Sequence, residues 1–500
     1  MTTLTEKLQV RAASSKWLTL CAVCLGLMML MIDSFVVNVA FPSIARDLRA
    51  DLATIEWAVS GYVLVLGVLP IAMGRLGDIF GRRKIYLLGL VLFVLASIAC
   101  GAANSITALV IARVVQGAGA AIMMPGTLSL ITQAFPPQQR GLAIGIWSGV
   151  SGLGLIAGPI LGGFLTEYDW RWIFYVNVPL GALALLMAAL WVNESRDEHV
   201  PRSVDWLGLV TLSVGLFLIM FGVTRGNKDG WTSAPIVACF VGGVALLAAF
   251  IVIERRVRYP LIDLSLFRNA TFVSACLSAF LFSAAVFGSQ PYTSLFMQNF
   301  WGFSPREGGL AFVPATMLVA AVMPFGGIMG QRLGGRLRWI IIAGSLAVFI
   351  SFLYLFGLST QSNYWNGFLP ALLLRGIGIG LVMASTSFAV VSSVPMAKSG
   401  LASGTLTMAR NLGTAMGVAV LGTVFLQHID GSLAAQLSGA SVAQIAGAAE
   451  HFAVAGDGAT RTLIETIVIT GFIRIAWVGA LLCGAATVAA LFVRHRLQTR

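Results

Sequence analysis

The stretch WLTLCAVCLGLMMLMIDSFVVNVAF, Trp17 to Phe41, is apolar along almost its whole length and carries one acidic residue, Asp33. A helix of about 20 apolar residues crosses the ~30 Å hydrocarbon core of a bilayer, so this stretch predicts a transmembrane helix. An ionised carboxylate in hydrocarbon is costly and by default marks an ion or proton site. Asp33 is therefore the first candidate functional residue.

Similar apolar stretches recur through the 500 residues, of which 58% are hydrophobic and 10% charged, with a mean hydropathy of +0.89. A soluble domain is about 25% charged. Fourteen stretches have the length of a membrane-spanning helix, and the alternating pattern of barrel strands is absent. The sequence therefore predicts an all-α polytopic membrane protein. The predicted spans are 17–41, 54–73, 84–102, 106–126, 140–165, 172–192, 204–223, 234–253, 270–291, 308–329, 339–358, 366–389, 399–427 and 467–493.

The position of the basic residues explains the net charge of +12 better than nucleic-acid binding does. With the N-terminus in the cytoplasm, the cytoplasmic segments hold about three times as many Lys and Arg residues as the outer ones, as the positive-inside rule requires. We therefore expect a multi-pass protein of the cytoplasmic membrane with both termini in the cytoplasm. No nucleic-acid partner and no metal site are expected, because the histidines form no cluster and the cysteines lie within apolar spans.

The second half of the chain repeats features of the first. GLAIG, Gly141 to Gly145, reappears as GLASG, Gly400 to Gly404, and Pro70 is echoed by Pro324. Duplicated halves with a substrate site between them are a recurring transporter plan. We therefore predict three parts of the chain. They are an N-terminal six-helix bundle at 1–192, a linker and two inserted spans at 193–268, and a C-terminal six-helix bundle at 269–500 with an outer loop at 428–465.

The run GRLGDIFGRRK, Gly74 to Lys84, joins the second and third spans on the expected cytoplasmic side. Glycines permit a tight turn and close helix approach, and an aspartate can cap a helical turn or pair with an arginine. We expect this cluster to latch a cytoplasmic gate; a positive-inside anchor is the alternative. Its candidate residues are Gly74, Asp78, Gly81, Arg82 and Arg83.

The same run resembles the signature loop of the major facilitator superfamily. DSFVVNVAFP, Asp33 to Pro42, is similar to the first-span motif of the fourteen-spanner drug:proton antiporters, a family of quaternary-ammonium and multidrug exporters. RVVQGAGAA, Arg113 to Ala121, resembles the buried-arginine motif of that family, and GLGLIAGPILGG, Gly152 to Gly163, its antiporter motif. The resemblance implies the major facilitator fold, with two six-helix bundles plus two inserted helices and fourteen transmembrane helices in all.

The resemblance also implies a function. It indicates a proton-coupled antiporter, not an enzyme, that exports drugs or amphipathic, often cationic, compounds. An exporter of one endogenous metabolite or an uptake symporter of the same fold is the alternative; a channel or receptor is the alternative from another class. GIGIG, Gly376 to Gly380, has no βαβ context, so no nucleotide site is predicted. We expect no cofactor, a proton gradient as energy source, a small-molecule substrate, protons and lipid as partners, and a monomer.

Asp33 and Arg113 are expected to meet. At ~1.5 Å per residue, Asp33 lies about 24 Å above Trp17, and Arg113 lies about 10–12 Å below the outer end of its span. Burial disfavours a charged carboxylate and a nearby arginine favours it, so a group balanced between them can exchange a proton near neutral pH. We predict that the pair is a proton-coupling or cation site; a static ion pair is the alternative.

Small residues in the fifth span, Gly154, Gly158 and Gly162, allow close helix approach, and Pro159 can kink the helix. We interpret this span as a pliable helix at the interface between the halves; plain close packing is the alternative. Aromatic and polar residues of other spans are candidates for lining a substrate cavity. They are Asn38, Tyr62, Gln116, Trp147, Gln290, Tyr292, Tyr354 and Arg410.

Overall fold

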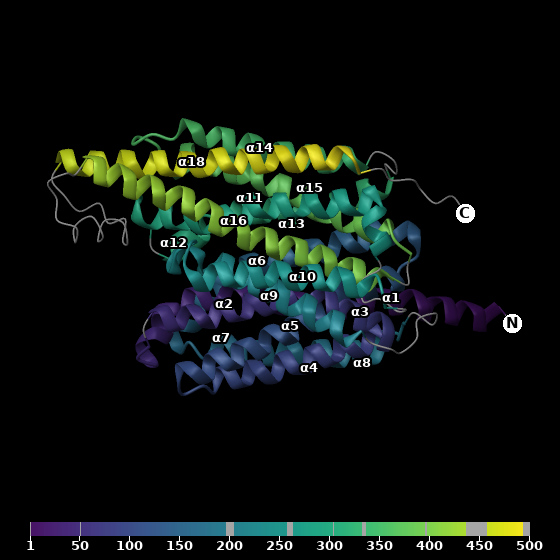
Figure 1. Cartoon of the computed structure of the whole chain (residues 1–500). Helices are drawn as coiled ribbons and strands as arrows, with labels where there is room; N and C mark the ends of the chain where they lie inside the picture. Colours follow the sequence, from purple (N-terminus) through teal and green to yellow (C-terminus); the bar gives the residue numbers. More distant parts are fainter. Residues whose placement is uncertain are drawn as a thin grey trace.

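The computed structural model describes residues 2–50, 52–196, 205–257, 264–303, 305–332, 337–395, 398–436 and 458–493. These ranges contain helices and no strand. The long helices run side by side, and the start of the first helix lies at the same end of the bundle as the end of the last (Figure 1). Helices suit a membrane because each satisfies its backbone hydrogen bonds within itself.

The first half of the chain forms one group of helices, in which α1 packs against α6 and α8, and α5 packs against α4 and α2. A serine at the start of α5 caps that helix, because the side chain of Ser105 accepts a hydrogen bond from the amide of Ala108. The helices are α1 (Thr2–Asp47), α2 (Leu52–Val68), α3 (Pro70–Phe80), α4 (Arg82–Gly101), α5 (Ile106–Ala134), α6 (Pro137–Tyr168), α7 (Trp172–Tyr175) and α8 (Asn177–Trp191).

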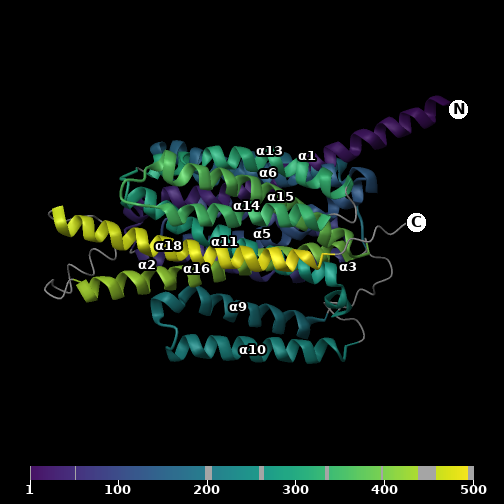
Figure 2. The ribbon, with the colours of Figure 1, turned by 90° about the horizontal axis from the view of Figure 1, so that it is seen from above.

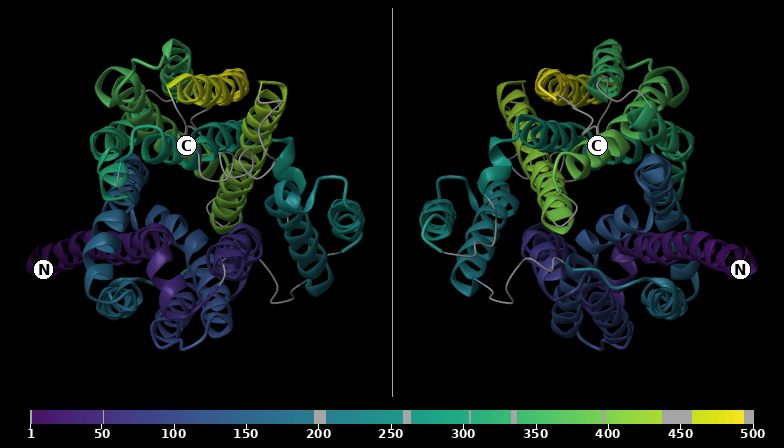
Figure 3. Two further views of the ribbon diagram at one scale, coloured as in Figure 1. Left: turned by 90° about the vertical axis from the view of Figure 1, so that its left-hand side faces the viewer. Right: turned by 90° about the vertical axis from the view of Figure 1, so that its right-hand side faces the viewer.

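The second half forms a group built in the same way. Figure 3, which looks along the long helices, shows the two groups side by side and facing each other. Here α11 packs against α16 and α18, and α15 packs against α13 and α14. The elements are η1 (Leu264–Arg268), α11 (Ala270–Asn299), α12 (Pro305–Leu310), α13 (Val313–Arg332), α14 (Leu337–Tyr354), η3 (Leu355–Gly357), η4 (Tyr364–Phe368), α15 (Leu369–Ser392), α16 (Ser399–Gln436) and α18 (Gly458–Leu491).

Two helices between these groups, α9 (Trp206–Asp229) and α10 (Ala234–Glu254), form a hairpin at the side of the molecule (Figure 2). Helix α9 contacts α2 of one group and α16 of the other, whereas the main contact of α10 is with α9. The hairpin is therefore attached to the two groups of helices mainly through α9, as an inserted pair of helices would be. The predicted residue boundaries of the three parts of the chain remain a prediction.

Twelve helices of the described part are long and apolar enough to cross a membrane, and thirteen if α2 and α3 count as one bent span. The remaining predicted span, 140–165, lies within the 32-residue helix α6, which is not among the twelve. The multi-pass helical architecture is therefore confirmed, and the total of fourteen spans is not.

One predicted span start near the N-terminus agrees with the structure and one predicted loop does not. The first candidate span is Lys16–Val37, close to the predicted 17–41, although helix α1 itself extends from Thr2 to Asp47. The expected loop from Gly74 to Lys84 is helical as far as Phe80, because the chain bends by 50° earlier, at the break before Pro70. Proline has no amide hydrogen to donate, so it ends α2 and is well suited to begin α3.

The two halves touch through related contacts at the end of the bundle where α1 begins. A Cβ added at Gly145 of α6 would lie 2.7 Å from Pro324 of α13, and one added at Gly404 of α16 would lie 2.5 Å from the carbonyl oxygen of Pro70 of α3. Each helix uses glycine to approach a proline-containing helix of the other half. The sequence echoes therefore correspond to equivalent places in space.

Farther along, the same two helices pack within their own halves. An added Cβ at Gly158 would lie 2.8 Å from the Cβ of Phe35 on α1, and one at Gly154 would lie 2.5 Å from the Cβ of Met31. Gly417 of α16 makes the corresponding close approach to Ala284 of α11. In the fifth predicted span, Gly145 therefore lies at the interface between the halves, and the motif glycines Gly154 and Gly158 do not.

Candidate functional site

The charge predicted in the first span lies in a sealed ion pair. The side chain of Asp33 on α1 is 0% exposed and that of Arg113 on α5 is 2% exposed. Nη1 of Arg113 donates to Oδ2 of Asp33 over 2.7 Å. Helices α1 and α5 therefore bring together the two residues that the sequence singles out.

Two amides complete the coordination of the Asp33 carboxylate. Nε2 of Gln116 and Nδ2 of Asn177 donate to Oδ1 over 2.8 Å and 2.9 Å, respectively. Both amide residues are 0% exposed. Hydrogen bonds to a carboxylate oppose the cost of moving its charge out of water. The charged form of Asp33 is therefore held by three donors from two other helices, α5 and α8.

The guanidinium of Arg113 is held equally well. Its Nε donates to the carbonyl oxygen of Ala58 on α2 over 3.1 Å, and its Nη1 also donates to Oε1 of Gln116 over 2.7 Å. The ring of Tyr62, on the same helix as Ala58, lies 4.2 Å from the central carbon, within cation–π range. The ion pair therefore connects α1, α2, α5 and α8.

Ser97 of α4 joins the two amides that bind Asp33. Its hydroxyl accepts hydrogen bonds from Nδ2 of Asn177 over 3.0 Å and Nε2 of Gln116 over 3.2 Å, and it donates to the carbonyl oxygen of Phe174 over 2.9 Å. Sequence reasoning missed Ser97 and Asn177. Both are polar residues in apolar helices, and this is the sequence feature by which they could have been found.

This network can respond to a single proton. A proton on Asp33 would neutralise the carboxylate and leave the buried charge of Arg113 without a counter-ion. An uncompensated buried charge is strongly unfavourable, so the packing of the four helices is coupled to the protonation of one group. The sealed environment also means that proton exchange requires a different conformation.

The predicted gate loop makes a second buried ion pair. Nη2 of Arg82 lies 2.6 Å from Oδ1 of Asp78, and the two side chains are 1% and 0% exposed. Oδ2 of Asp78 accepts from the amide of Leu401, over 3.1 Å, in the first turn of α16. A carboxylate at a helix N-terminus satisfies an amide that has no partner within the helix. Asp78 thus ties α3 to α16 of the other half, beside the close contact of Gly74 with Gly400.

The linker after α8 also binds the gate loop, which sequence reasoning did not predict. The carboxylate of Glu194 accepts hydrogen bonds from the amides of Arg83 and Lys84, over 3.0 Å and 3.2 Å. It lies against Gly81, whose φ of +116° suits glycine alone. Arg83 also donates to the carbonyl oxygen of Ala189 in α8. The start of α4 is therefore capped by the segment that leads out of the N-terminal group.

The candidate cavity residues do not form one cluster. Tyr62 and Gln116 belong to the buried network, and Trp147 is 6% exposed within the core. The hydroxyl of Tyr292 donates to the carbonyl oxygen of Val418, and that of the exposed Tyr354 to Asn366, near the outer end of α14. Gln290 and Arg410 are half-buried, and Gly162 is buried. The side chains of Asn38 and Pro159 lie outside the described residues.

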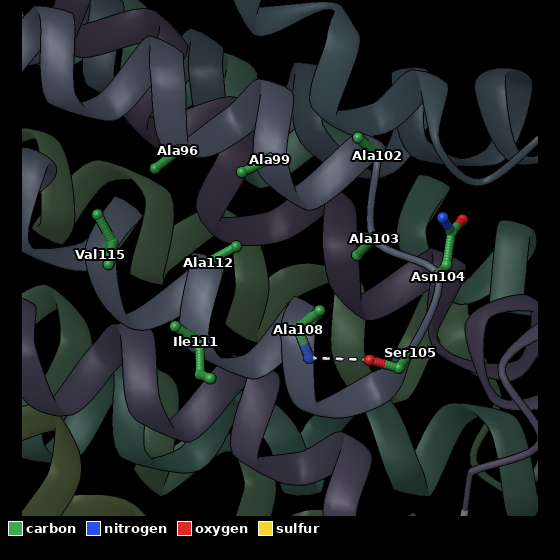
Figure 4. Close-up of a pocket in the computed structure, with 10 residues that line it drawn as sticks. All are labelled: Ala96, Ala99, Ala102, Ala103, Asn104, Ser105, Ala108, Ile111, Ala112 and Val115. Carbon is green, nitrogen blue, oxygen red and sulfur yellow. Dashed lines mark hydrogen bonds between the residues drawn. The ribbon is translucent and has the colours of Figure 1, made fainter.

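A groove of about 660 Å³ runs between α4 and α5, and none of the candidate residues lines it (Figure 4). Its walls are alanines and a few larger residues, among them Ala99, Ala108 and Val115, and its polar end is formed by Asn104 and Ser105. Both helices belong to the N-terminal group, so the groove does not lie between the halves. The residues that bind Asp33 and Arg113 do not line it.

Comparison with known proteins identifies the family. A sequence profile of the Major Facilitator Superfamily matches residues 23–418. The chain is 35% identical over 416 residues to the tetracenomycin C resistance and export protein of Streptomyces glaucescens, which covers 83% of this chain and 76% of that protein. It is 36% identical over 418 residues to the multidrug resistance protein Stp of Mycobacterium tuberculosis, covering 83% and 77%.

Two solved structures of XylE, both with low sequence identity to this chain, share its fold. The proton:xylose symporter XylE is 14% identical with a TM-score of 0.58, over 92% of this chain and 95% of that one. A double-tryptophan mutant of XylE is 13% identical with a TM-score of 0.65, over 97% of each chain. Together with the apolar helices, these matches show that the chain belongs to the major facilitator superfamily and is a multi-pass membrane transporter of a small-molecule substrate, not an enzyme.

Proposed function

We propose that this transporter exports drugs or other amphipathic, often cationic, compounds across the cytoplasmic membrane in exchange for protons. Relatives named for tetracenomycin C export and for multidrug resistance, each at least 35% identical, support export. We further propose that it needs no cofactor, works as a monomer and keeps both termini in the cytoplasm. The excess of basic residues in the segments on that side supports this orientation.

The observation that carries proton coupling is the sealed pair of Asp33 and Arg113. In the state described here the carboxylate accepts hydrogen bonds from Arg113, Gln116 and Asn177, which favour its charged form, and it is 0% exposed. Loss of the charge on protonation weakens all these bonds, so the proton favours another arrangement of α1, α5 and α8. A ligand shifts an equilibrium only by its differential affinity for the two states. Here the ligand is the proton, which Asp33 binds with different affinity in the two arrangements.

The state described here is closed at the end where α1 begins. Asp78 bonds to Leu401 across the halves, and the glycine contacts of Gly145 and Gly404 lie at the same end. With the proposed orientation, this end faces the cytoplasm. The charged carboxylate and a closed cytoplasmic gate therefore belong to one state, and protonation of Asp33 favours the other.

Asp33→Asn tests the proposal, with Asp47→Asn as the matched control. Both carboxylates lie on α1, but Asp47 is 48% exposed at its outer end and Asp33 is 0% exposed. In everted vesicles, we expect Asp33→Asn to abolish export driven by a proton gradient while the protein stays folded, and Asp47→Asn to export normally. Unchanged export by a folded Asp33→Asn protein would remove Asp33 from the mechanism and leave the static ion pair.

A transporter of one endogenous metabolite is the second candidate. The names of two relatives refer to single natural products, tetracenomycin C and actinorhodin, whereas others are named for multidrug resistance. Proton release from everted vesicles, measured against a panel of cationic and neutral drugs and metabolites, separates the two. A response to many drugs supports drug export, a response to a single metabolite supports the second candidate, and uptake into the cell in symport with protons would contradict both.

A further inference from the structure

Two arginines of the C-terminal group, the buried Arg375 and the half-buried Arg410, are not paired with a carboxylate among the described residues. No Asp or Glu occurs between Glu307 and Asp430, a stretch that includes α13, α14, α15 and most of α16. Arg375 and Arg410 lie within that stretch, and neither makes a salt bridge to a described residue. A charge in a membrane protein requires a partner or a water-filled cavity. Among the described residues these two arginines therefore have no counter-ion, and a bound anion would supply one.

Arg410 of α16 has part of its guanidinium fixed and part free. Its Nη2 donates to three acceptors on α15, which are the carbonyl oxygen of Met383 at 2.8 Å, Oγ1 of Thr386 at 2.9 Å and Oγ of Ser387 at 3.0 Å. Its buried Nε has no hydrogen-bond partner, and its Nη1 donates to no residue of the described ranges. The side chain is half-buried. It is therefore held in position with unused donors.

Arg410 lies near the middle of the membrane and next to a contact between the halves. It lies 11 residues after Ser399, so it is about 16 Å along α16 from the cytoplasmic end at ~1.5 Å per residue, close to the middle of the membrane. The next residue, Asn411, donates to the carbonyl oxygen of Leu66 on α2 over 3.0 Å, which is a contact between the halves. Transporters with duplicated halves bind substrate near the midplane where the halves meet.

Arg375 shows what an arginine without a carboxylate looks like when it is enclosed. It is 5% exposed and packs on the ring of Phe352, 4.2 Å from its centre. Its Nε and Nη1 donate to the hydroxyls of Ser351 and Ser289, over 3.2 Å and 3.4 Å. Helix α15 begins at Leu369, so Arg375 lies about 9 Å from the outer end of that helix. Counted from Tyr364, where the apolar span begins, Arg375 is as deep as Arg410, so the two differ in shielding: Arg375 is buried and Arg410 is half-buried.

We propose that Arg410 binds an acidic group, a carboxylate or a phenolate, on the transported molecule. The inference rests on the proposed export function and narrows its substrates to compounds that carry such a group, including zwitterions. Hydrogen bonds from a guanidinium to a carboxylate are charge-assisted and among the strongest side-chain contacts. The bound acid supplies a counter-ion that Arg410 does not have among the described residues, so substrate binding pairs a charge near the middle of the membrane.

Rhodamine B and its ethyl ester are a suitable pair of probes, because they differ only in whether the carboxylate is free. Proton-driven accumulation of each dye is measured in everted vesicles with the wild type, Arg410→Gln, Arg410→Lys and Arg375→Gln. We expect Arg410→Gln to lower export of the acid about tenfold or more and that of the ester less than about twofold. Arg410→Lys keeps the charge and should restore part of the preference. Arg375→Gln is the matched control and should change both dyes equally.

Several outcomes would overturn the proposal. A folded Arg410→Gln protein, as judged by size-exclusion chromatography, that loses both dyes equally would show a packing role. Export of the ester but not the acid by the wild type would exclude the anion site and leave the export function intact. Export of neither dye would count against the export function itself.

Inorganic anions are the other source of a counter-ion. Wild type and Arg410→Gln are compared for the midpoint of thermal unfolding in chloride and in gluconate. We expect no difference between the salts. A lower midpoint of the wild type in gluconate that Arg410→Gln does not show, together with equal loss of both dyes, would assign the site to chloride and contradict the proposal.

Discussion

The buried arginines of the two groups of helices have different partners. In the N-terminal group, Arg113 has a carboxylate, a carbonyl oxygen, an amide oxygen and an aromatic ring around it. In the C-terminal group, Arg375 has two serine hydroxyls and a ring. Both helices, α5 and α15, occupy corresponding places in their groups. Duplication therefore preserved the packing plan while the two halves acquired different chemistry.

This difference suggests that the two halves have different functions. A buried ion pair contributes little net stability compared with apolar residues of the same size, so stability does not account for Asp33 and Arg113. A carboxylate with a fixed set of donors is a group whose protonation changes the structure around it. Half-buried Arg410 has no carboxylate partner among the described residues, and we propose that it binds an anion instead. We infer that the N-terminal half couples to protons and the C-terminal half binds the acidic group of the substrate.

The largest effect that would test this comparison comes from one substitution made in both halves. Arg113→Met leaves Asp33 buried without its counter-ion and should lower the free energy of unfolding by about 3–5 kcal/mol. Arg375→Met removes a charge that has no carboxylate partner and should be neutral or stabilising. The midpoint of thermal unfolding in detergent measures both. A large loss of stability in both variants would show that the two arginines are equivalent.

A smaller effect is expected at the contact between the halves. Asp78→Asn removes the ion pair with Arg82 and weakens the bond to the amide of Leu401, at a cost of about 1–3 kcal/mol to the closed state. Opening of that end is measured by maleimide labelling of Gly149→Cys, since an added Cβ there would be 3.5 Å from the nearest atom, on α13 of the other half. We expect faster labelling in the presence of Asp78→Asn.

The control for the gate experiment is Asp47→Asn, which should leave the labelling rate unchanged because Asp47 lies outside the gate. Equal rates with and without Asp78→Asn would mean that Asp78 anchors the loop and does not hold the halves together. That result would favour the alternative that the loop is a positive-inside anchor. Labelling of the protein without the introduced cysteine gives the background.

The smallest effect belongs to the exposed pair of Asp47 with Arg171. Hydrogen bonds from Trp170 and then from Arg171 lower the pKa of Asp47 below its ordinary value of 3.8. Its contribution to stability is therefore present above that value and is lost as the pH falls through the lowered pKa. Asp47→Asn should cost less than about 1 kcal/mol at neutral pH and nothing in strong acid. A difference in thermal unfolding that grows on acidification would contradict this assignment.

Part of the site followed from the sequence because helices have a fixed rise. Asp33 and Arg113 are exceptional charges in apolar spans, and counting residues from the span ends puts them at similar depths. Their contact at 2.7 Å agrees with that expectation. Asn177 and Ser97 could not be placed in the same way, because which side of α8 or α4 faces Asp33 depends on helix rotation. The bond from Glu194 to the gate loop depends on the course of a linker.

The residue order alone is enough to identify a multi-pass helical membrane protein with duplicated features, because apolar length is sufficient to specify a span in a bilayer. It also determined which residues carry unusual charge. Which charges are paired is known only from the three-dimensional structure, because pairing needs side chains from helices far apart in sequence to meet within about 3 Å. In the described part of the chain, Arg113 has a carboxylate partner and Arg410 does not, and Gly145, not Gly158, faces the other half.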